Sequence, residues 1–218
     1  MTLRRRPDWS LYLVTNRTLL GNRVPEEVIG AAVLGGVTAV QLREKDLPTR
    51  DFVEIAARLR NVLKPLGIPL IINDRPDVAL AAGADGVHLG QRDVSCSAAR
   101  KILGPAALIG LSVETERQAE EAESLEIDYL GVSAVFTTPI KTDTAMIWGL
   151  EGLRRLRGRS RHPLVAIGGI NAANVAEVIE AGADGIAVVS AILGADDPEA
   201  AARDLRRRIE DARLRRIG

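Results

Sequence analysis

The tetrapeptide GADG at residues 83–86 recurs as GADG at residues 182–185. Each copy follows a helical pattern and runs directly into a short apolar segment, 86–90 (GVHLG) or 185–190 (GIAVVS). Glycine commonly ends a helix, and an apolar run of this length is typical of a buried strand. The repeat therefore marks a helix-to-strand junction that the chain uses twice, and it predicts a fold built from repeated strand–helix units.

The rest of the chain continues this alternation. Strands are predicted at 10–16, 37–45, 69–74, 86–90, 107–113, 128–136, 164–170 and 185–190. Helices are predicted at 24–34, 49–66, 78–82, 97–103, 116–125, 150–156, 172–181 and 198–215. Eight such units predict an α/β fold, a closed parallel (β/α)8 TIM barrel with outer helices. An open doubly wound sheet is the alternative, but no G-x-G-x-x-G follows the first strand. We expect one domain over residues 1–218, with 1–8 as an N-terminal arm.

Composition narrows the functional class. Hydrophobic residues make up 46% of the chain but aromatic residues only 3%, which suits an aliphatic core of buried parallel strands. The 29 basic and 29 acidic residues balance, whereas a nucleic-acid binder is expected to carry a basic excess. A single cysteine, Cys96, excludes an internal disulfide and fits a reducing compartment. No apolar run is long enough to span a membrane. We therefore expect a cytoplasmic protein that binds neither nucleic acid nor membranes, and a homo-oligomer remains open.

Charged and amide side chains follow the predicted strand at 37–45 (VTAVQLREK). Alternate residues of a strand face the same side, so Gln41, Arg43 and Lys45 project together while Leu42 and Glu44 project the other way. An amide and two cations at the end of a buried strand indicate an anion site, most plausibly for phosphate or diphosphate. The alternative is a strand end that frays into a solvated loop.

Other strand ends add groups to the same end of the barrel, where TIM-barrel sites lie. These are Asn73, Asp74, Asp93, Ser112, Thr138, Lys141, Gly168, Gly169, Val189 and Ser190. The two aspartates suit Mg²⁺ completed by water and substrate phosphate, although each alone could cap a helix. The glycine pair and the amides after the last strand suit a phosphate, although the pair could instead form a helix-capping turn. Two facing phosphate sites indicate transfer between two phosphorylated partners. His88, inside a strand, is predicted to be a packed, hydrogen-bonded barrel residue.

Six motifs together resemble the thiamine-phosphate synthase family. They are QLREK at 41–45, IND at 72–74, VHLGQRD at 87–93, LSV at 111–113, TPIKTD at 138–143 and IGGI at 167–170. The resemblance implies a transferase of thiamine biosynthesis. It joins 4-amino-2-methyl-5-hydroxymethylpyrimidine diphosphate to thiazole phosphate, or to its carboxylate, and releases pyrophosphate with Mg²⁺. In that family the carbon–oxygen bond breaks first, and the thiazole nitrogen captures a pyrimidine-methyl cation.

The resemblance also implies a role for each matching residue. The pyrimidine diphosphate would be held by Gln41, Arg43, Lys45 and Asn73, with Ser112 and Lys141 orienting the pyrimidine and the departing pyrophosphate. Mg²⁺ would be bound by Asp74 and Asp93. The thiazole phosphate would be held by Thr138, Ile140, Gly169, Val189 and Ser190. The groups expected to act in catalysis are Arg43, Lys45, Ser112 and Lys141.

Three positions depart from the family pattern: Ile140 replaces a usual Thr, Thr137 a usual Pro, and Glu114 a common His. The loss of the Thr hydroxyl is expected to weaken thiazole-phosphate binding by about 1 kcal/mol. One alternative is a thiazole tautomerase-like isomerase, which typically lacks the Asp after Asn and uses a His at position 114. Another is a non-catalytic barrel that binds thiazole phosphate without turnover.

Overall fold

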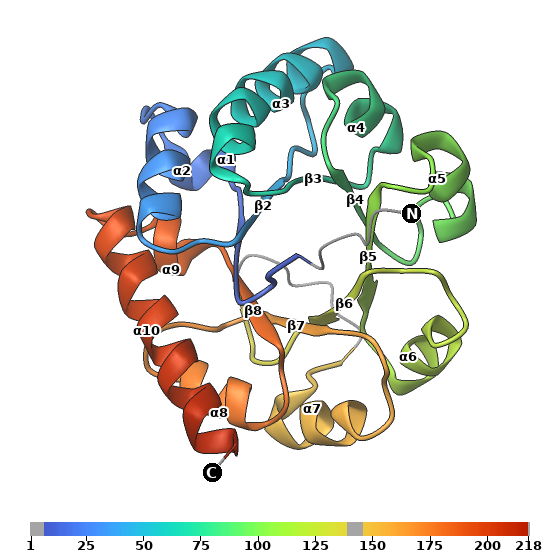
Figure 1. The fold of residues 1–218 in the computed structure, drawn as a ribbon, viewed down its shortest axis with the longest axis vertical. Coiled ribbons are helices and arrows are strands. Elements are labelled where there is room, and N and C mark those ends of the chain that lie inside the picture. The colour runs from blue at the N-terminus through green and yellow to red at the C-terminus, as the bar shows by residue number, and fades with distance from the viewer. Residues whose placement is uncertain (1–6, 139–145, 218) are drawn as a thin grey trace.

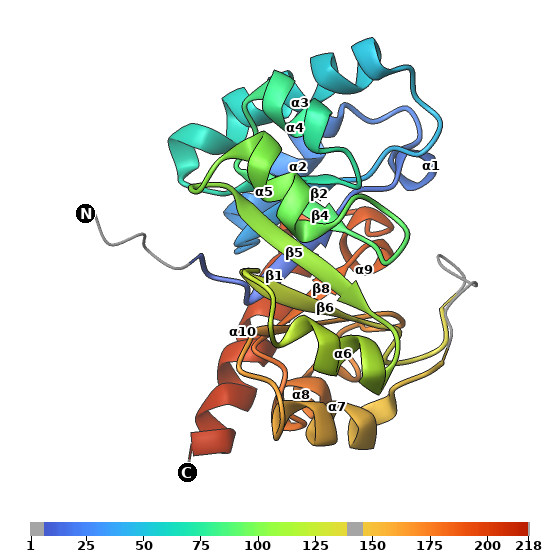
Figure 2. The same ribbon diagram turned by 90° about the vertical axis from the view of Figure 1, so that its right-hand side faces the viewer.

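The computed structural model describes residues 7–138 and 146–217, and its eight strands close into a parallel barrel in chain order. The last strand pairs with the first through the register Leu11↔Ile186. Figure 1 looks along the barrel, and Figure 2 shows the arrowheads of β5 and β6 at the same end. The predicted (β/α)8 barrel is confirmed. Its strands are β1 Leu11–Val14, β2 Ala39–Leu42, β3 Leu70–Asn73, β4 Gly86–Leu89, β5 Leu108–Val113, β6 Tyr129–Ser133, β7 Leu164–Ile167 and β8 Gly185–Val188.

Helices surround the barrel as an outer ring (Figure 1). They are α1 Arg17–Leu20, α2 Pro25–Leu34, α3 Thr49–Leu63 with the 3-10 turn η1 Lys64–Leu66, α4 Pro76–Ala82, α5 Cys96–Leu103, α6 Glu116–Ala122, α7 Gly149–Arg157, α8 Val175–Glu180, α9 Ser190–Leu193 and α10 Pro198–Ile217. Within residues 7–138 and 146–217, no helix combines the length and apolar character that a bilayer span needs.

Two short helices were not predicted from the sequence. Helix α1 follows Asn16, whose side chain accepts a hydrogen bond from the Leu19 amide at 3.1 Å and so caps the helix. Helix α9 begins at Ser190, which the sequence placed at the end of a strand. The predicted strand at 185–190 was therefore too long at its end, because β8 stops at Val188 and helix α9 begins at Ser190. A short extra helix at this point of a barrel often accompanies a phosphate site.

Each strand divides its side chains between two environments. On β1, Leu11 and Leu13 pack outward under the helices, whereas Tyr12 and Val14 point into the barrel. The interior cluster consists of Trp9, Tyr12, Val14, Ala39, Ile71, Leu108, Tyr129, Val165 and Ala187. The aliphatic core predicted from composition is therefore the layer between strands and helices, while Trp9 and both tyrosines lie inside the barrel.

The GADG repeat has the same structural role at both places. Its first glycine, Gly83, has φ 63°, a left-handed conformation that ends the helix. The carboxylate of Asp85 then accepts a hydrogen bond from the Leu70 amide at 2.9 Å. In the second copy Asp184 accepts from the Leu164 amide at 2.8 Å. Each aspartate thus pins the start of its own strand to the start of the preceding one.

The last glycine of each copy is required by the close approach of the next strand. A Cβ on Gly86 would lie 2.0 Å from the Leu108 carbonyl oxygen, and one on Gly185 would lie 1.8 Å from the Trp9 carbonyl oxygen. Both contacts are with backbone, which cannot move aside without breaking the ladder. The second of these positions lies where the barrel closes.

We predict that Gly86→Ala lowers the free energy of unfolding by about 1–3 kcal/mol, because the new methyl group would overlap the neighbouring strand. Urea denaturation measures the loss. Gly30→Ala is the control: a Cβ there meets nothing within 4 Å, and alanine favours the interior of α2. That variant should gain up to about 1 kcal/mol. Equal stability of the two variants would contradict the steric explanation.

Candidate active site

The carboxyl ends of the strands surround a mouth that has two adjoining compartments. The first compartment has a volume of about 270 Å³ and the second about 240 Å³. Both are lined by Ser133, Ile167 and Ala187, so a ligand in one compartment would lie beside a ligand in the other.

The predicted site residues divide between these compartments. The first compartment is lined by Gln41, Arg43, Lys45, Asn73, Asp74, Asp93 and Ser112. The second is lined by Thr138, Gly168, Gly169, Val189 and Ser190. Ile140 and Lys141 lie outside the described residues. The charged side chains among the described lining residues therefore all lie in the first compartment, whereas the second is uncharged and includes the glycine pair and two hydroxyls of the predicted set.

Alternation continues beyond the end of β2, as the sequence predicts. The strand ends at Leu42, which packs into the outer core, while Arg43 and Lys45 line the first compartment. Glu44 lies on the opposite side, in a surface hollow that it shares with Arg17. The Arg43 amide donates a hydrogen bond of 2.9 Å to the Thr15 hydroxyl, which holds this segment against the end of β1. This contact fixes Arg43, but the paired strand ends at Leu42, short of the predicted end at Lys45, and Lys45 lies in an exposed loop.

Asp74 and Asp93 meet in the first compartment. Asp74 has φ 63°, a left-handed conformation that is uncommon for a residue with a side chain, and it forms an ion pair with Lys45. Asp93 accepts a hydrogen bond of 2.7 Å from the Gly90 amide. Burial raises the pKa of Asp93, and the hydrogen bond and negative charge of Asp74 raise it further.

Two adjacent carboxylates repel each other because both carry negative charge. A divalent cation between them would supply the positive charge that offsets this repulsion. The capping alternative for these aspartates is wrong: the residue before α4 is Arg75, without a side-chain cap, and α5 is capped by Ser95. Among the described residues no group of three or more His, Cys, Asp or Glu side chains could hold a metal. This donor set suits a hard ion whose other ligands come from water and substrate.

Asn73, at the end of β3, presents an unused donor to the first compartment. Its side chain is buried, and its Nδ2 atom has no hydrogen-bond partner. A buried amide nitrogen without a partner is costly, so such a group usually marks a place where a ligand or water binds. Asn73 is thus available to a ligand in this compartment.

The glycine pair after β7 is required by the segment that follows β6. Gly168 and Gly169 have φ 105° and 65°. A Cβ on Gly168 would lie 2.6 Å from the Ala134 Cβ, and one on Gly169 would lie 2.7 Å from the Thr137 carbonyl oxygen. The pair follows a strand rather than a helix, so the helix-capping alternative is wrong. The glycines let the two loops pass closely while their backbone lines the second compartment.

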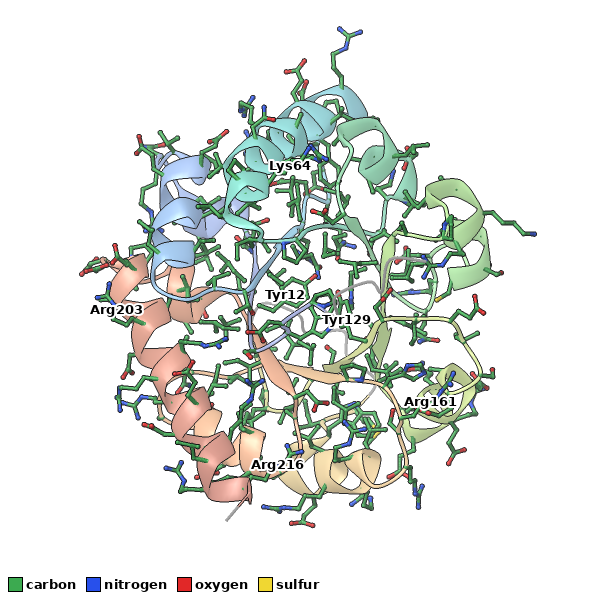
Figure 3. All side chains as sticks on the ribbon, viewed as in Figure 1. Tyr12, Lys64, Tyr129, Arg161, Arg203 and Arg216 are labelled. Atoms are coloured by element: carbon green, nitrogen blue, oxygen red, sulfur yellow. The ribbon has the colours of Figure 1, made fainter. Side chains whose placement is uncertain are left out.

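Among the residues of the first compartment that were not predicted as site residues are three ring side chains: Tyr12, His88 and Tyr129. The chain has two tyrosines and two histidines, so this group contains both tyrosines and one histidine. All three side chains are buried. Figure 3 shows Tyr12 and Tyr129 together in the middle of the barrel. His88 is packed and hydrogen-bonded, as predicted, but it also faces the cavity. Its inward-facing position between Val87 and Leu89 on β4 was the signal that the sequence offered.

Comparison with known proteins identifies the family. Residues 11–192 match the family model described as thiamine monophosphate synthase. A thiamine-phosphate synthase of Albidiferax ferrireducens is 56% identical over 200 residues, which cover 92% of this chain and 91% of the relative. The chain belongs to the thiamine-phosphate synthase family. A second relative of that name, from Moorella thermoacetica, is 48% identical over 207 residues, or 95% of this chain and 99% of the relative.

Solved structures agree with this assignment. The thiamine phosphate pyrophosphorylase of Pyrococcus furiosus superposes with a TM-score of 0.87 at 42% identity, covering 95% of this chain and 98% of that one. A 3-hexulose-6-phosphate synthase, at 20% identity and a TM-score of 0.65, shares the fold alone. The resemblance inferred from the sequence is confirmed. Thiamine-phosphate synthases are transferases of thiamine biosynthesis, and they need a divalent metal ion.

We predict that Mg²⁺ added with inorganic pyrophosphate raises the melting temperature of the wild type. A ligand at a hundred times its Kd adds about 2.7 kcal/mol to the free energy of unfolding. Asp93→Asn should lose most of this shift because it removes one of the two carboxylates. Asp77→Asn is the matched control, since Asp77 is an exposed carboxylate on α4 that pairs with Arg75. Equal shifts for the two variants would contradict a metal site at Asp93.

Proposed function

We propose that this chain joins 4-amino-2-methyl-5-hydroxymethylpyrimidine diphosphate to thiazole phosphate, releasing pyrophosphate with the help of Mg²⁺. The observation that carries the proposal is the divided mouth. One compartment gathers cations and paired carboxylates, and the compartment beside it offers glycine backbone and hydroxyls. Two phosphorylated substrates bound in this way would bring their reacting ends together at the shared wall.

The pyrimidine diphosphate is assigned to the first compartment. Arg43 and Lys45 supply the positive charge that its phosphates need, and Asn73 offers a free amide donor. The role of Lys141, which lies outside the described residues, stays a prediction from the family resemblance. Asp74 and Asp93 would hold Mg²⁺, which neutralises the charge that grows on the pyrophosphate as it leaves. Lys45 pairs with Asp74 in the ligand-free site, so a bound metal and diphosphate would redistribute the same charges.

The thiazole phosphate is assigned to the second compartment. Gly168 and Gly169 expose their backbone there, and Ser190 begins α9 at its rim. Backbone amides and a serine hydroxyl bind phosphate oxygens well without adding charge. Thr138 lines the same compartment, whereas Ile140 cannot contribute the hydroxyl that the family pattern has at that position.

The chemical step is a dissociative substitution. The bond between the pyrimidine methylene carbon and the diphosphate oxygen breaks, and its electron pair leaves with pyrophosphate. The methylene carbon then carries the positive charge, and the lone pair of the thiazole nitrogen forms the new carbon–nitrogen bond. The floor of the first compartment is closed by the buried rings of Tyr12 and Tyr129. That floor would keep water from competing with the thiazole for the cation.

The domain extent, the cellular compartment, the partners and the oligomeric state are proposed from the sequence alone. We propose a single domain over residues 1–218 that acts in the cytoplasm on small molecules and binds neither nucleic acid nor membranes. The balanced charge supports this proposal. The homo-oligomer stays a prediction.

We predict that the wild type releases pyrophosphate only when both substrates and Mg²⁺ are present, and that EDTA abolishes the release. Asp74→Asn should lower the rate at least about a hundredfold, because it weakens the binding of the metal ion that stabilises the leaving group. Asp77→Asn, on α4, should retain the wild-type rate. A coupled phosphate assay on the folded proteins measures all three.

The contrary outcome is also specific. A folded wild type that binds thiazole phosphate but releases no pyrophosphate would establish a non-catalytic binding barrel in place of a synthase.

We further predict that Ser190→Ala raises the KM for thiazole phosphate about fivefold, the effect of one net hydrogen bond of about 1 kcal/mol. The kcat and the KM for the pyrimidine diphosphate should stay unchanged. Ser124→Ala, an exposed serine outside both compartments, is the control. Steady-state kinetics with each substrate varied in turn provide the test. An increase in the KM for the pyrimidine diphosphate instead would place Ser190 at the wrong substrate.

A further inference from the structure

Five side chains form one continuous line of hydrogen bonds under the first compartment. Gln41 Nε2 lies 3.2 Å from the Tyr12 hydroxyl, which lies 2.9 Å from the Tyr129 hydroxyl. The Tyr129 hydroxyl lies 2.9 Å from His88 Nδ1, and His88 Nε2 lies 2.8 Å from the Ser112 hydroxyl. Both ends of the line, Gln41 and Ser112, belong to the group assigned to substrate binding.

The barrel makes room for this line with glycines. A Cβ on Gly110 would lie 2.2 Å from the Tyr129 ring, and one on Gly131 would lie 2.8 Å from His88 Cε1. Trp9 packs beneath, with its ring centroid 4.2 Å from that of Tyr129. The His88 and Tyr129 rings are stacked, with their centroids 5.4 Å apart. Two inward-facing positions are therefore left without side chains so that these rings fit, which indicates that the rings are held in place.

Counting the protons available on each group fixes which group donates and which accepts in every hydrogen bond of the line. A phenol has one proton, and burial raises the pKa of both tyrosines, so each hydroxyl keeps its proton. Tyr12 accepts from the Gln41 amide and therefore donates to Tyr129. Tyr129 then donates to His88 Nδ1, which leaves the ring proton of a neutral imidazole on Nε2. That proton is donated to the Ser112 oxygen.

We propose that this line is a polarised relay in which Tyr12, Tyr129 and His88 are positioning residues that make Ser112 a hydrogen-bond donor toward the first compartment. Because its oxygen already accepts from His88, the Ser112 proton is directed to the cavity that this side chain lines. At the other end the same polarity keeps the Gln41 amide nitrogen, rather than its carbonyl oxygen, on the Tyr12 hydroxyl. We call these three inner residues the Tyr12–Tyr129–His88 relay.

The polarity matters because of the charge of the ligand, and this step rests on the proposed function. A diphosphate offers only acceptor oxygens. Ser112 as a donor adds to the unpartnered amide of Asn73 and to the cations Arg43 and Lys45. In the reverse polarity Ser112 would donate to His88 and would turn a lone pair toward an anion. The relay therefore favours the bound diphosphate and, more strongly, the fuller charge of the departing pyrophosphate.

The first test uses the ligand-free wild type and needs no activity. The chain has two histidines, so nitrogen-15 NMR correlation of the imidazoles, assigned with His162→Gln, reports the tautomer of His88 directly. The expected result at neutral pH is a neutral ring with its proton on Nε2. A proton on Nδ1, or on both nitrogens, would reverse or break the relay and overturn the proposal.

The second test removes the donor to His88. Tyr129→Phe keeps the ring but leaves Nδ1 without a proton to accept, so the fixed tautomer should give way to a mixture. The kcat/KM for the pyrimidine diphosphate should fall about tenfold, the effect of misdirecting one hydrogen bond to a charged group. The KM for thiazole phosphate should not change. Tyr12→Phe, which removes the donor to Tyr129 that sets the direction of the line, should also loosen the His88 tautomer and lower the same kcat/KM.

Trp9→Phe is the packing control. It disturbs the same aromatic cluster but touches none of the hydroxyls, so it should lower the melting temperature and leave the tautomer and the kcat/KM unchanged. An equal kinetic loss in Trp9→Phe, or a Tyr129→Phe enzyme with wild-type kinetics, would overturn the relay. Absence of pyrophosphate release from the wild type would instead contradict the proposed function, and the NMR result would still decide the polarity.

Discussion

The pairing of β8 with β1 is the interaction on which the rest of the molecule depends. Closure gives every strand two neighbours and forces alternate side chains to opposite faces, one under the helices and one inside the barrel. It also brings all carboxyl ends to one rim, because every strand runs parallel to the next. Gly185 permits this closure by letting β8 approach the backbone at Trp9. The site is therefore a consequence of closure: residues distant in sequence meet because their strands end together.

The interior of so small a barrel has room for few large side chains, and this chain concentrates them at one level. Tyr129 and His88 occupy the space that Gly110 on β5 and Gly131 on β6 leave open, and Tyr12 and Trp9 pack against Tyr129. Above them the interior is polar and open, and below them it is closed. Gly110 and Gly131 thus make room for the rings that fill the lower half of the barrel and also form the floor of the cavity. Tyr12, Tyr129 and His88 therefore serve both stability and the cavity, whereas Trp9, which lies beneath the floor, serves packing alone.

Much of the fold and of the site could be read from the sequence because both follow from strand period and strand ends. Gln41, Arg43 and Lys45 line one cavity because alternation persists beyond the last paired residue of β2. Helix α1 escaped prediction because four residues are too few to show a helical period, and only the Asn16 cap gives it away. His88 was correctly read as packed, but its access to the cavity depends on Gly131, a residue on another strand. Such a cross-strand vacancy has no signature within either segment.

Under the proposed function the two sides of the mouth would bind phosphate by different means, and the difference would follow from what each substrate must do. A group that leaves as pyrophosphate gains charge during the reaction, so its side benefits from mobile cations, a metal and directed donors whose interactions strengthen as the bond breaks. A phosphate that merely anchors the thiazole keeps its charge throughout. For it, the backbone and hydroxyl contacts proposed at Gly169 and Ser190 would suffice, and further charge would only slow release of the product. Lys45 and Asp74 fit the first role because they neutralise each other before the substrate arrives. The carboxylates and lysine therefore remain close in the empty site, and the bound diphosphate finds an environment already arranged to receive it.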